Sequence, residues 1–374
     1  MTRSRNSTPC HFFYGYFFDI FIKVSYGIGL RVNGLLLKGD RMNKQNSQKI
    51  VNIKNKSVIS RIGAVREIII FGLVVLLFVV FFFTTKGIIF GQDSLRIIFV
   101  AVSELGIVTI GITMLIISGE FDLSVGSISA MGALLAAKIY HFGLNPFLAL
   151  VIALIVGAVL GWFNGFVTVK FKIPSFIVTL ATMMGYRGLI YIITEGTPIG
   201  FKVFETHPAF HKFIAGELGV IPVPFIWLVI ATIIFALILN YRRFGNHVFA
   251  VGGNMETARA MGINTGKIKI ICFMTLGMLS ALAGIMRVAR VRSFHSLQGE
   301  NIALLAIAAA VIGGTLLKGG VGTVLGAVAG TIVIVLVEYG LIMSRVGAYI
   351  YNLVLGAVII VVVILNNIIE QRRK

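Results

Sequence analysis

Apolar runs of about 20 residues recur along most of this chain, and they restrict its possible folds more than any other feature. An α-helix of that length crosses a hydrocarbon layer roughly 30 Å thick. The runs show no period-two alternation, so a barrel of strands is not indicated. With 57% hydrophobic and 13% charged residues in 374, the composition is also outside the soluble range. The sequence predicts an all-α integral membrane protein.

We expect about ten transmembrane helices, with both termini in the cytoplasm. Lys and Arg concentrate before the first predicted span, after the fourth, between the sixth and seventh, and at the C-terminus, as the positive-inside rule requires. Arg287, Arg290 and Arg292 lie outside on this count and oppose it. The rule also accounts for the net charge of +19 without a nucleic-acid partner. The predicted spans are residues 68–85, 97–118, 123–141, 146–169, 174–194, 224–240, 267–287, 301–317, 321–342 and 346–367.

Residues 1–66 form a basic arm that precedes a polytopic domain, residues 67–370. The arm lacks the layout of a signal peptide. The residues just before Met42 can be encoded by a purine-rich ribosome-binding sequence, which predicts that translation starts at Met42 and that residues 1–41 are not made. The alternative is an ordinary basic tail, and the intact mass of the natively expressed protein distinguishes the two.

The polar segment at residues 241–269 separates two apolar runs and carries the signals of a short helix. Asn254 can cap this helix, and Glu256 lies in its first turn, where the helix dipole favours an anion. Gly262 can adopt the left-handed conformation that ends it. The charge distribution places the segment in the cytoplasm. It is either a docking loop for a soluble partner or a solvated loop whose basic residues fix the topology.

The segment from Ser118 to Gly132 places Glu120 and Asp122 at the junction of two predicted spans. Charged groups beside hydrocarbon are costly and usually face a partner or a wet cavity. The Asp122 carboxylate can accept from the first amides of the following helix, so the junction either holds the turn or faces a permeation path. Four other ionisable residues lie within or beside the spans, and some are expected to pair: Glu104, Arg187, Glu300 and Glu338.

Two glycine-rich segments, residues 156–169 and 321–334, resemble each other. Glycine at every fourth residue lets a neighbouring backbone approach one face of a helix. The segments lie in the fourth and ninth predicted spans, which run in opposite directions, as an inverted repeat of five spans requires. The alternative is chance similarity between two glycine-rich helices. The matched positions are Gly157, Gly161, Gly165, Gly322, Gly326 and Gly330.

No catalytic or metal-binding motif accompanies these features. The chain lacks GxxxxGK[ST], HExxH and GxSxG, and its two cysteines and six histidines have no ligand spacing. We predict no enzyme activity, no metal and no cofactor on this chain. Transport driven by ATP would require hydrolysis on another subunit. The longest predicted external loop, residues 195–222, is an expected partner surface, and four phenylalanines in it are expected to form an interfacial helix: Phe201, Phe204, Phe210 and Phe213.

Four segments between residues 97 and 367 together resemble the permease subunits of bacterial ribose-type ABC sugar importers. GEFDLSVGSISAMGALLAA resembles their GGxDLSVG segment, and NGFVTVKFKIPSFIVTLATMMGYRGL resembles their KIPxFIxTL and RGL segment. FGNHVFAVGGNMETARAMGI resembles FGRxxxAxGGNxEAARxxGI. AIAAAVIGGTLLKGGVGTVLGAVAG resembles AIAAxxxGGTSLxGGxGxxxGxxxG.

The resemblance implies a permease of the bacterial cytoplasmic membrane that dimerises with a second copy or a sibling permease. It also implies an external substrate-binding protein and two cytoplasmic ATPase subunits that carry ATP and Mg. The residues matching the motif that couples to the ATPase are Asn254, Glu256, Ala258, Arg259 and Gly262. Those matching the DLSVG motif are Asp122, Leu123, Ser124 and Gly126, with Glu120 in place of a common glycine. Met255, Thr257, His247 and Lys318 also depart from the pattern.

The resemblance implies a ribose-like pentose or a hexose as the transported solute. Nucleosides or a furanosyl signal molecule are alternatives within the same architecture. A secondary carrier driven by an ion gradient is an alternative from another class, and it would need intramembrane carboxylates to bind the ion. Asp122, Glu104 and Glu338 are the candidates for that role.

Overall fold

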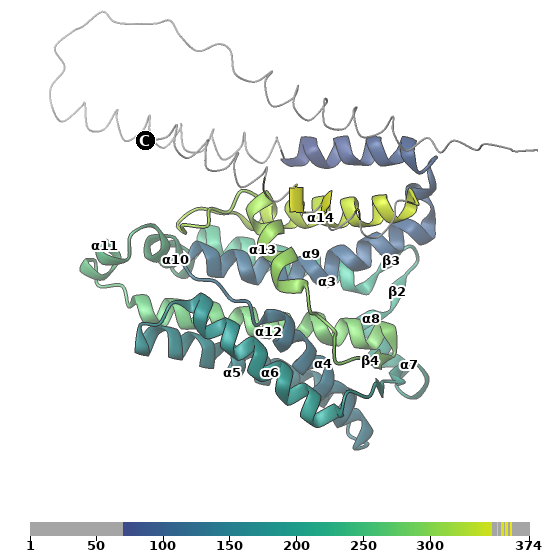
Figure 1. The fold of residues 1–374 in the computed structure, drawn as a ribbon, viewed down its shortest axis with the longest axis horizontal. Helices are drawn as coiled ribbons and strands as arrows, with labels where there is room; N and C mark the ends of the chain where they lie inside the picture. Colours follow the sequence, from purple (N-terminus) through teal and green to yellow (C-terminus); the bar gives the residue numbers. More distant parts are fainter. Residues whose placement is uncertain (1–69, 346–349, 351–352, 355, 358–359, 361–374) are drawn as a thin grey trace, which may run out of the picture. The chain divides into compact units, whose positions relative to one another are not determined.

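The computed structural model describes residues 70–345, 350, 353, 354, 356, 357 and 360. The predicted basic arm, the start at Met42 and most of the tenth predicted span lie outside these residues. Helices dominate the described part (Figure 1). In chain order the elements are the helix Ile70–Thr84, η1 (Ile88–Phe90), α3 (Gln92–Ile117), α4 (Val125–His141), α5 (Pro146–Phe171), α6 (Ser175–Thr194), β1 (Ile199–Gly200), α7 (Val203–Thr206), α8 (Pro208–Ala215), β2 (Glu217–Leu218), β3 (Ile221–Pro222), α9 (Val223–Tyr241), α10 (Arg243–Gly253), α11 (Met255–Ala260), α12 (Thr265–Val291), β4 (Ser293–Phe294), α13 (Ile302–Ile312) and α14 (Val324–Met343).

Six described helices are long and apolar enough to cross a membrane: α3, α5, α6, α9, α12 and α14. The helix Ile70–Thr84 and α13 are shorter apolar helices. Each of the first nine predicted spans therefore corresponds to a helix, because α4 covers most of the third. The strands are two-residue pairs, β1 with β4 and β2 with β3, both antiparallel. The chain is an all-helical integral membrane protein.

Local signals set several helix boundaries. Asn145 Oδ1 accepts from Phe147 N at 2.9 Å, and Pro146 occupies the first position of α5, where it needs no amide partner. Thr323 Oγ1 accepts from Gly326 N at 3.0 Å and caps α14. At the other end, Arg292 closes α12 in a left-handed conformation with φ 62°. These boundaries are encoded by residues at the helix ends themselves.

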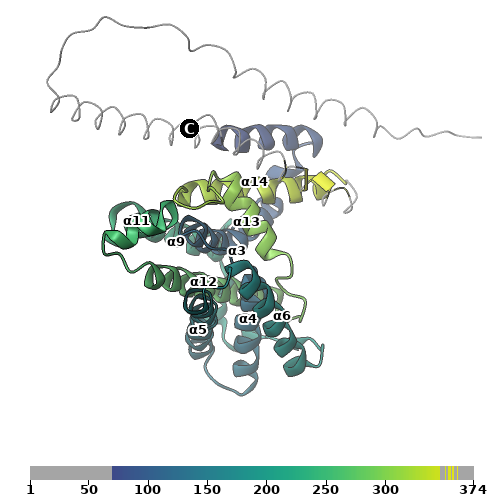
Figure 2. The same ribbon diagram turned by 60° about the vertical axis from the view of Figure 1, so that its left-hand side comes forward.

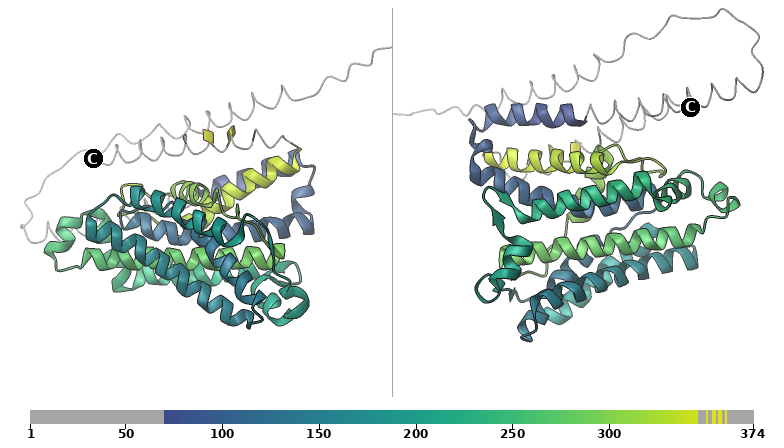
Figure 3. Two further views of the ribbon diagram at one scale, coloured as in Figure 1. Left: turned by 60° about the horizontal axis from the view of Figure 1, so that its bottom comes forward. Right: turned by 180° about the vertical axis from the view of Figure 1, so that it is seen from behind.

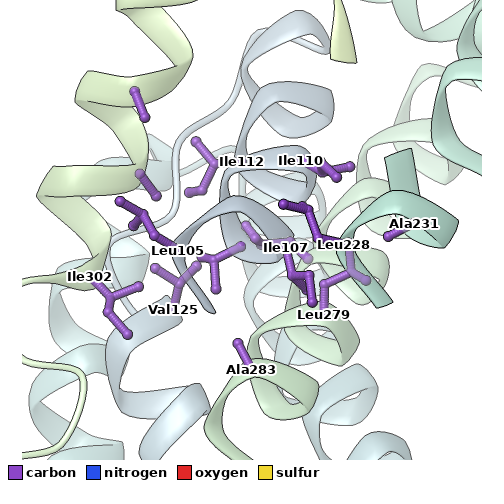
Figure 4. Packing of buried hydrophobic residues seen from close by; sticks show 14 of the residues in the cluster. Leu105, Ile107, Ile110, Ile112, Val125, Leu228, Ala231, Leu279, Ala283 and Ile302 are labelled. Carbon is purple, nitrogen blue, oxygen red and sulfur yellow. The ribbon is translucent and has the colours of Figure 1, made fainter. Parts of the chain in front are cut away.

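Helices α3 and α12 form the centre of the described helical domain. Helix α3 packs against α9, α12, α13 and α14, while α12 packs against α3, α4 and α5 (Figures 1 and 3). Figure 2 shows α13 beside α14 and α3. Buried side chains from three helices meet in the core: Ile107 of α3, Leu228 of α9 and Leu279 of α12 (Figure 4). Since lipid is as apolar as these side chains, close packing stabilises this contact more than exclusion from water does.

Glycines allow the backbones of α5 and α12 to approach closely. A Cβ placed on Gly157 would lie 2.5 Å from the carbonyl oxygen of Gly277, and one on Gly161 would overlap the carbonyl of Phe273. A Cβ on Gly165 would lie 3.0 Å from Ile270 Cα. No larger side chain fits at Gly161 without separating the two helices.

Gly326 and Gly330 of α14 face α13 in the same way. A Cβ on either would overlap a carbonyl of that helix, at Gly313 and Ala309 respectively. The prediction that Gly322 belongs to the same helix face is wrong, because α14 begins at Val324. Gly322 lies in the preceding turn, where a Cβ would be 2.9 Å from the Ile117 side chain.

Three predicted boundaries or segments also differ from the structure. The span predicted at 301–317 ends as a helix at Ile312, because Gly314 turns the chain with φ 87°. The 241–269 segment is more helical than expected, since it contains α10 as well as α11 and the start of α12. The external phenylalanines do not form one interfacial face: Phe201 and Phe210 are fully buried.

Gly161→Leu is expected to prevent normal assembly of the permease, because the leucine side chain would occupy the space of the α12 backbone. Gly185→Leu on α6 is the matched control, since a Cβ there has no neighbouring atom within 4 Å. Size-exclusion chromatography in mild detergent checks both variants. A Gly161→Leu protein that elutes and assembles like wild type would contradict the close contact.

Candidate functional site

Helix α11 is a short helix capped at both ends. Asn254 Oδ1 accepts from Thr257 N at 2.9 Å, and Glu256 lies in the first turn. Gly262, with φ 81°, follows the helix, and its amide donates to Arg259 O at 2.9 Å. The next amide, of Ile263, donates to Ala258 O at 3.1 Å, which completes a Schellman motif. The capped helix predicted from the sequence is therefore confirmed.

One face of α11 is anchored and the other is exposed. Ala258 is fully buried, while Glu256 and Arg259 are exposed. Arg259 Nε also donates to Thr265 Oγ1 at 3.1 Å, which joins α11 to the first residue of α12. The exposed face offers one acidic and one basic side chain on a helix of fixed conformation.

Glycines join the end of α10 to the end of α3, and we call Gly119, Gly252, Gly319 and Gly320 the glycine junction. A Cβ on Gly252 would overlap the carbonyl of Ile117 and lie 2.7 Å from Gly320 N. That amide donates to Ile117 O at 2.8 Å. Gly119, Gly319 and Gly320 have φ of 88°, 86° and 72°, which residues other than glycine rarely adopt.

The glycine junction was not predicted from the sequence. The signal was present in the chain as two glycine pairs, at 252–253 within the polar segment and at 319–320. Glycine is the residue expected where two backbones come into direct contact. The spacing of the pairs along the chain does not reveal which backbones meet.

An ion pair fixes the residue next to Gly119. Lys269 Nζ lies 2.5 Å from Glu120 Oε1, and the two side chains are only 14% and 13% exposed. Lys269 lies in the second turn of α12, close to Thr265. The segment at residues 241–269 is thus tied to the chain between α3 and α4 by the Glu120 ion pair and by the glycine junction.

Asp122 is fully buried in a hydrogen-bonded network. Its Oδ1 accepts from the amide and the hydroxyl of Ser124, both at 2.6 Å. Asn164 Nδ2 donates to Asp122 Oδ2 at 3.1 Å and to Ser124 Oγ at 2.7 Å. Tyr186 OH donates to Asn164 Oδ1 at 3.1 Å. The network connects the chain before α4 to α5 and α6.

The predicted cap at Asp122 is wrong in detail. Helix α4 begins at Val125, and the carboxylate binds Ser124 rather than the amides of the first turn. Leu123 N donates to Thr179 Oγ1 at 3.2 Å, and Gly126 lies against the backbone of Gly299. Asn164, Thr179 and Tyr186 were not identified from the sequence, because their partners lie 22 to 56 residues away along the chain.

Of the four intramembrane charges expected to pair with one another, Glu104 and Arg187 have other partners. Glu104 forms a bidentate pair with Arg290, at 2.8 Å from Nε to Oε1 and 3.1 Å from the terminal nitrogen to Oε2. Arg187 donates to the carbonyls of Ser296 and Gln298. Arg290, whose charge opposed the predicted topology, therefore has a carboxylate partner. Among the described residues no group of three or more His, Cys, Asp or Glu side chains is placed to hold a metal ion.

Comparison with known proteins gives consistent matches. The model of the family described as branched-chain amino acid transport system / permease component matches residues 94–363. The ribose import permease protein of Bacillus subtilis (strain 168) is 36% identical over 70% of this chain and 80% of its own length. The L-arabinose transport system permease protein of Escherichia coli (strain K12) is 34% identical over 73% of this chain and 82% of its own.

A third relative gives the same kind of match. The xylose/arabinose import permease protein of Sulfolobus acidocaldarius is 32% identical over 79% of this chain and 83% of its own length. No solved structure matches the chain. The family model covers well over half of the sequence, including α3 to α14. This chain belongs to the family of branched-chain amino acid transport system permease components.

Proposed function

We propose that this chain is the membrane-spanning permease subunit of an ATP-binding cassette importer that carries a monosaccharide across the bacterial cytoplasmic membrane. The family is a permease component and not an enzyme. Relatives named for ribose, xylose and arabinose support a pentose as the solute. ATP and Mg bind to separate ATPase subunits, and a substrate-binding protein delivers the sugar from outside.

The observation that carries this proposal is the exposed α11 joined to two long helices. The preceding helix, α10, contacts the end of α3 through Gly252. Helix α11 itself contacts the start of α12 through Arg259. The Glu120–Lys269 ion pair adds a second tie to α12. A displacement of α11 by an ATPase subunit would therefore shift α3 and α12 together. These two helices run the length of the helical domain (Figure 1).

We infer ten spans, both termini in the cytoplasm and an inverted repeat of five spans. The packing pattern supports the repeat: α5 packs on α4 and α12, and α14 packs on α13 and α3. In a repeat of five spans, α3, α4 and α5 of the first half correspond to α12, α13 and α14 of the second half. The contacts of α5 with α4 and α12 then correspond to the contacts of α14 with α13 and α3. Helices α5, α6 and α9 carry exposed apolar side chains, such as Val151, Phe176 and Ile233. These side chains face lipid or a second permease copy.

The ion-coupled carrier is less well supported. A carboxylate that binds a coupling ion needs a negative charge that no protein cation already neutralises, beside a wet cavity. Asp122 is fully buried and hydrogen-bonded to Ser124 and Asn164, and Glu104 pairs with Arg290. Both carboxylates already have partners within the protein. Nucleosides remain the alternative solute within the importer architecture.

Glu256→Ala and Arg259→Glu are expected to lower substrate-stimulated ATP hydrolysis about tenfold in the assembled complex. The first removes a charge from the exposed face of α11, and the second reverses one and also removes the hydrogen bond to Thr265. A tenfold effect corresponds to about 1.4 kcal/mol of coupling. The measurement compares ATP hydrolysis with and without the sugar-loaded binding protein.

Lys170→Glu is the control for these variants, because it reverses an exposed charge on α5 and leaves α11 intact. It is expected to retain stimulation within about twofold, since Lys170 lies outside α11 and exposed charge pairs typically contribute only a few tenths of a kcal/mol. Full stimulation in both α11 variants would rule out this helix as the ATPase contact.

A further inference from the structure

A cavity of about 550 Å³ lies at the end of α12 away from α11. Helix α12 has 27 residues and is about 40 Å long, with Thr265 beside α11 and Arg290 at the cavity. Figure 1 shows α11 and α8 at opposite ends of α12. The cavity volume is typical of small-molecule sites, which span about 300–1,000 Å³. It is therefore large enough for a monosaccharide.

The cavity reaches well into the helical domain. Along α3 its lining extends from Arg96 to Leu105, a rise of about 14 Å. On the other side the lining includes Gly299, Glu300 and Asn301, where the chain turns into α13. Gly299 is also the residue that lies against Gly126 of α4. The lining thus includes the turn before α13, which packs against the start of α4 through Gly299 and Gly126.

Seven charged residues line the cavity, and four of them form two pairs of opposite charge. Arg290 and Glu104 form the bidentate pair, and Arg96 pairs with Glu217. The Glu104 side chain is 10% exposed and that of Arg290 is 42% exposed, so the pair borders the open space. Paired guanidinium and carboxylate groups keep spare donors and acceptors for a ligand while cancelling each other's charge.

This lining selects a class of solute. A phosphate or sugar acid would bring its charge close to the carboxylates of Glu104 and Glu300, and a cation would approach the arginines. An apolar solute would leave buried polar groups without partners. Of the described lining residues only Tyr339 is aromatic, which offers little stacking surface for a nucleobase. Hydroxyl groups, which donate and accept, suit both members of each pair.

We propose that this cavity receives the solute from the binding protein and holds it as a neutral polyhydroxylated molecule, with Glu104 and Arg290 as its main hydrogen-bonding groups. The site rests on the importer function proposed above. It deepens that function by locating recognition on the permease, at the far ends of α3, which α10 contacts, and of α12, which α11 contacts.

Adjacent leucines on α13 provide the test. Leu305 lines the cavity, whereas Leu304, which projects about 100° away around the helix, does not line it and is 63% exposed. Each is replaced by cysteine in a Cys10→Ser background, where the remaining Cys272 is fully buried. The complete importer in proteoliposomes is treated from outside with the membrane-impermeant reagent 2-sulfonatoethyl methanethiosulfonate, and uptake of labelled D-ribose, D-xylose, L-arabinose and uridine is measured.

We expect modification of Leu305→Cys to lower pentose uptake at least tenfold and dithiothreitol to restore it, which separates blockage from misfolding. The same treatment of Leu304→Cys is expected to change pentose uptake less than twofold. Pentose at saturating concentration is expected to slow modification of Leu305→Cys. Normal uptake after complete modification of Leu305→Cys would overturn the cavity assignment, and uptake of uridine in preference to the pentoses would overturn the solute class. If the unmodified importer takes up none of these solutes with ATP, the proposed function is instead rejected.

Discussion

Gly252→Ala is expected to abolish substrate-stimulated ATP hydrolysis in the assembled importer. The added Cβ would overlap the carbonyl of Ile117 and lie 2.7 Å from Gly320 N, so α10 must move away from α3 or the Gly320–Ile117 hydrogen bond must break. Both are backbone contacts, which cannot relax by a side-chain rotation. We expect a loss of at least tenfold in stimulation.

Gly253→Ala is the matched control for this variant. The two glycines are adjacent in α10, so alanine gives each about the same gain in helix propensity. A Cβ on Gly253 has no neighbouring atom within 4 Å, and stimulation is expected to remain within about twofold of wild type. Equal stimulation in the two variants would contradict the glycine junction. ATP hydrolysis by purified complexes of equal subunit composition is the measurement.

Asn164→Ala is expected to destabilise the permease by about 2 kcal/mol or more. Asn164 donates to both Asp122 and Ser124 and accepts from Tyr186, so its removal leaves a buried carboxylate oxygen and a phenol without this partner. A buried polar group left without a partner costs about 1–3 kcal/mol, more if it is charged. The loss should appear as a lower midpoint of unfolding in detergent.

Tyr186→Phe is the comparison variant, with a smaller expected loss of stability than Asn164→Ala. It removes the hydroxyl that reaches Asn164 and leaves both bonds of Asn164 Nδ2 in place. We expect it to cost about 1 kcal/mol, the usual contribution of one hydrogen bond. An Asn164→Ala protein that unfolds at the wild-type midpoint would show that the network does not hold α4 to α5.

The features predicted from the sequence are those encoded by neighbouring residues. Apolar runs specify the membrane helices, and the cap of α11 depends on Asn254 and Gly262 within nine residues of each other. Such contacts form within one or two helical turns, where residue type determines hydrogen bonding directly. The fold class and the capped helix α11 could therefore be predicted without the structure.

The features that could not be predicted join distant residues. Glu104 and Arg290 are 186 positions apart, and Glu120 and Lys269 are 149 apart. A charge in a span indicates that a partner exists but does not identify it. Gly322 was misassigned because its four-residue spacing continues past the start of α14 at Val324. Spacing along the chain cannot distinguish a glycine in a helix from one in the preceding turn.

The most direct test of the proposed function is uptake by proteoliposomes that contain this chain with its ATPase subunits and sugar-loaded binding protein. We expect accumulation of a labelled pentose, among D-ribose, D-xylose and L-arabinose, that requires ATP and stops without either partner. Accumulation by the permease alone, driven by an ion gradient and independent of the ATPase, would contradict the importer function.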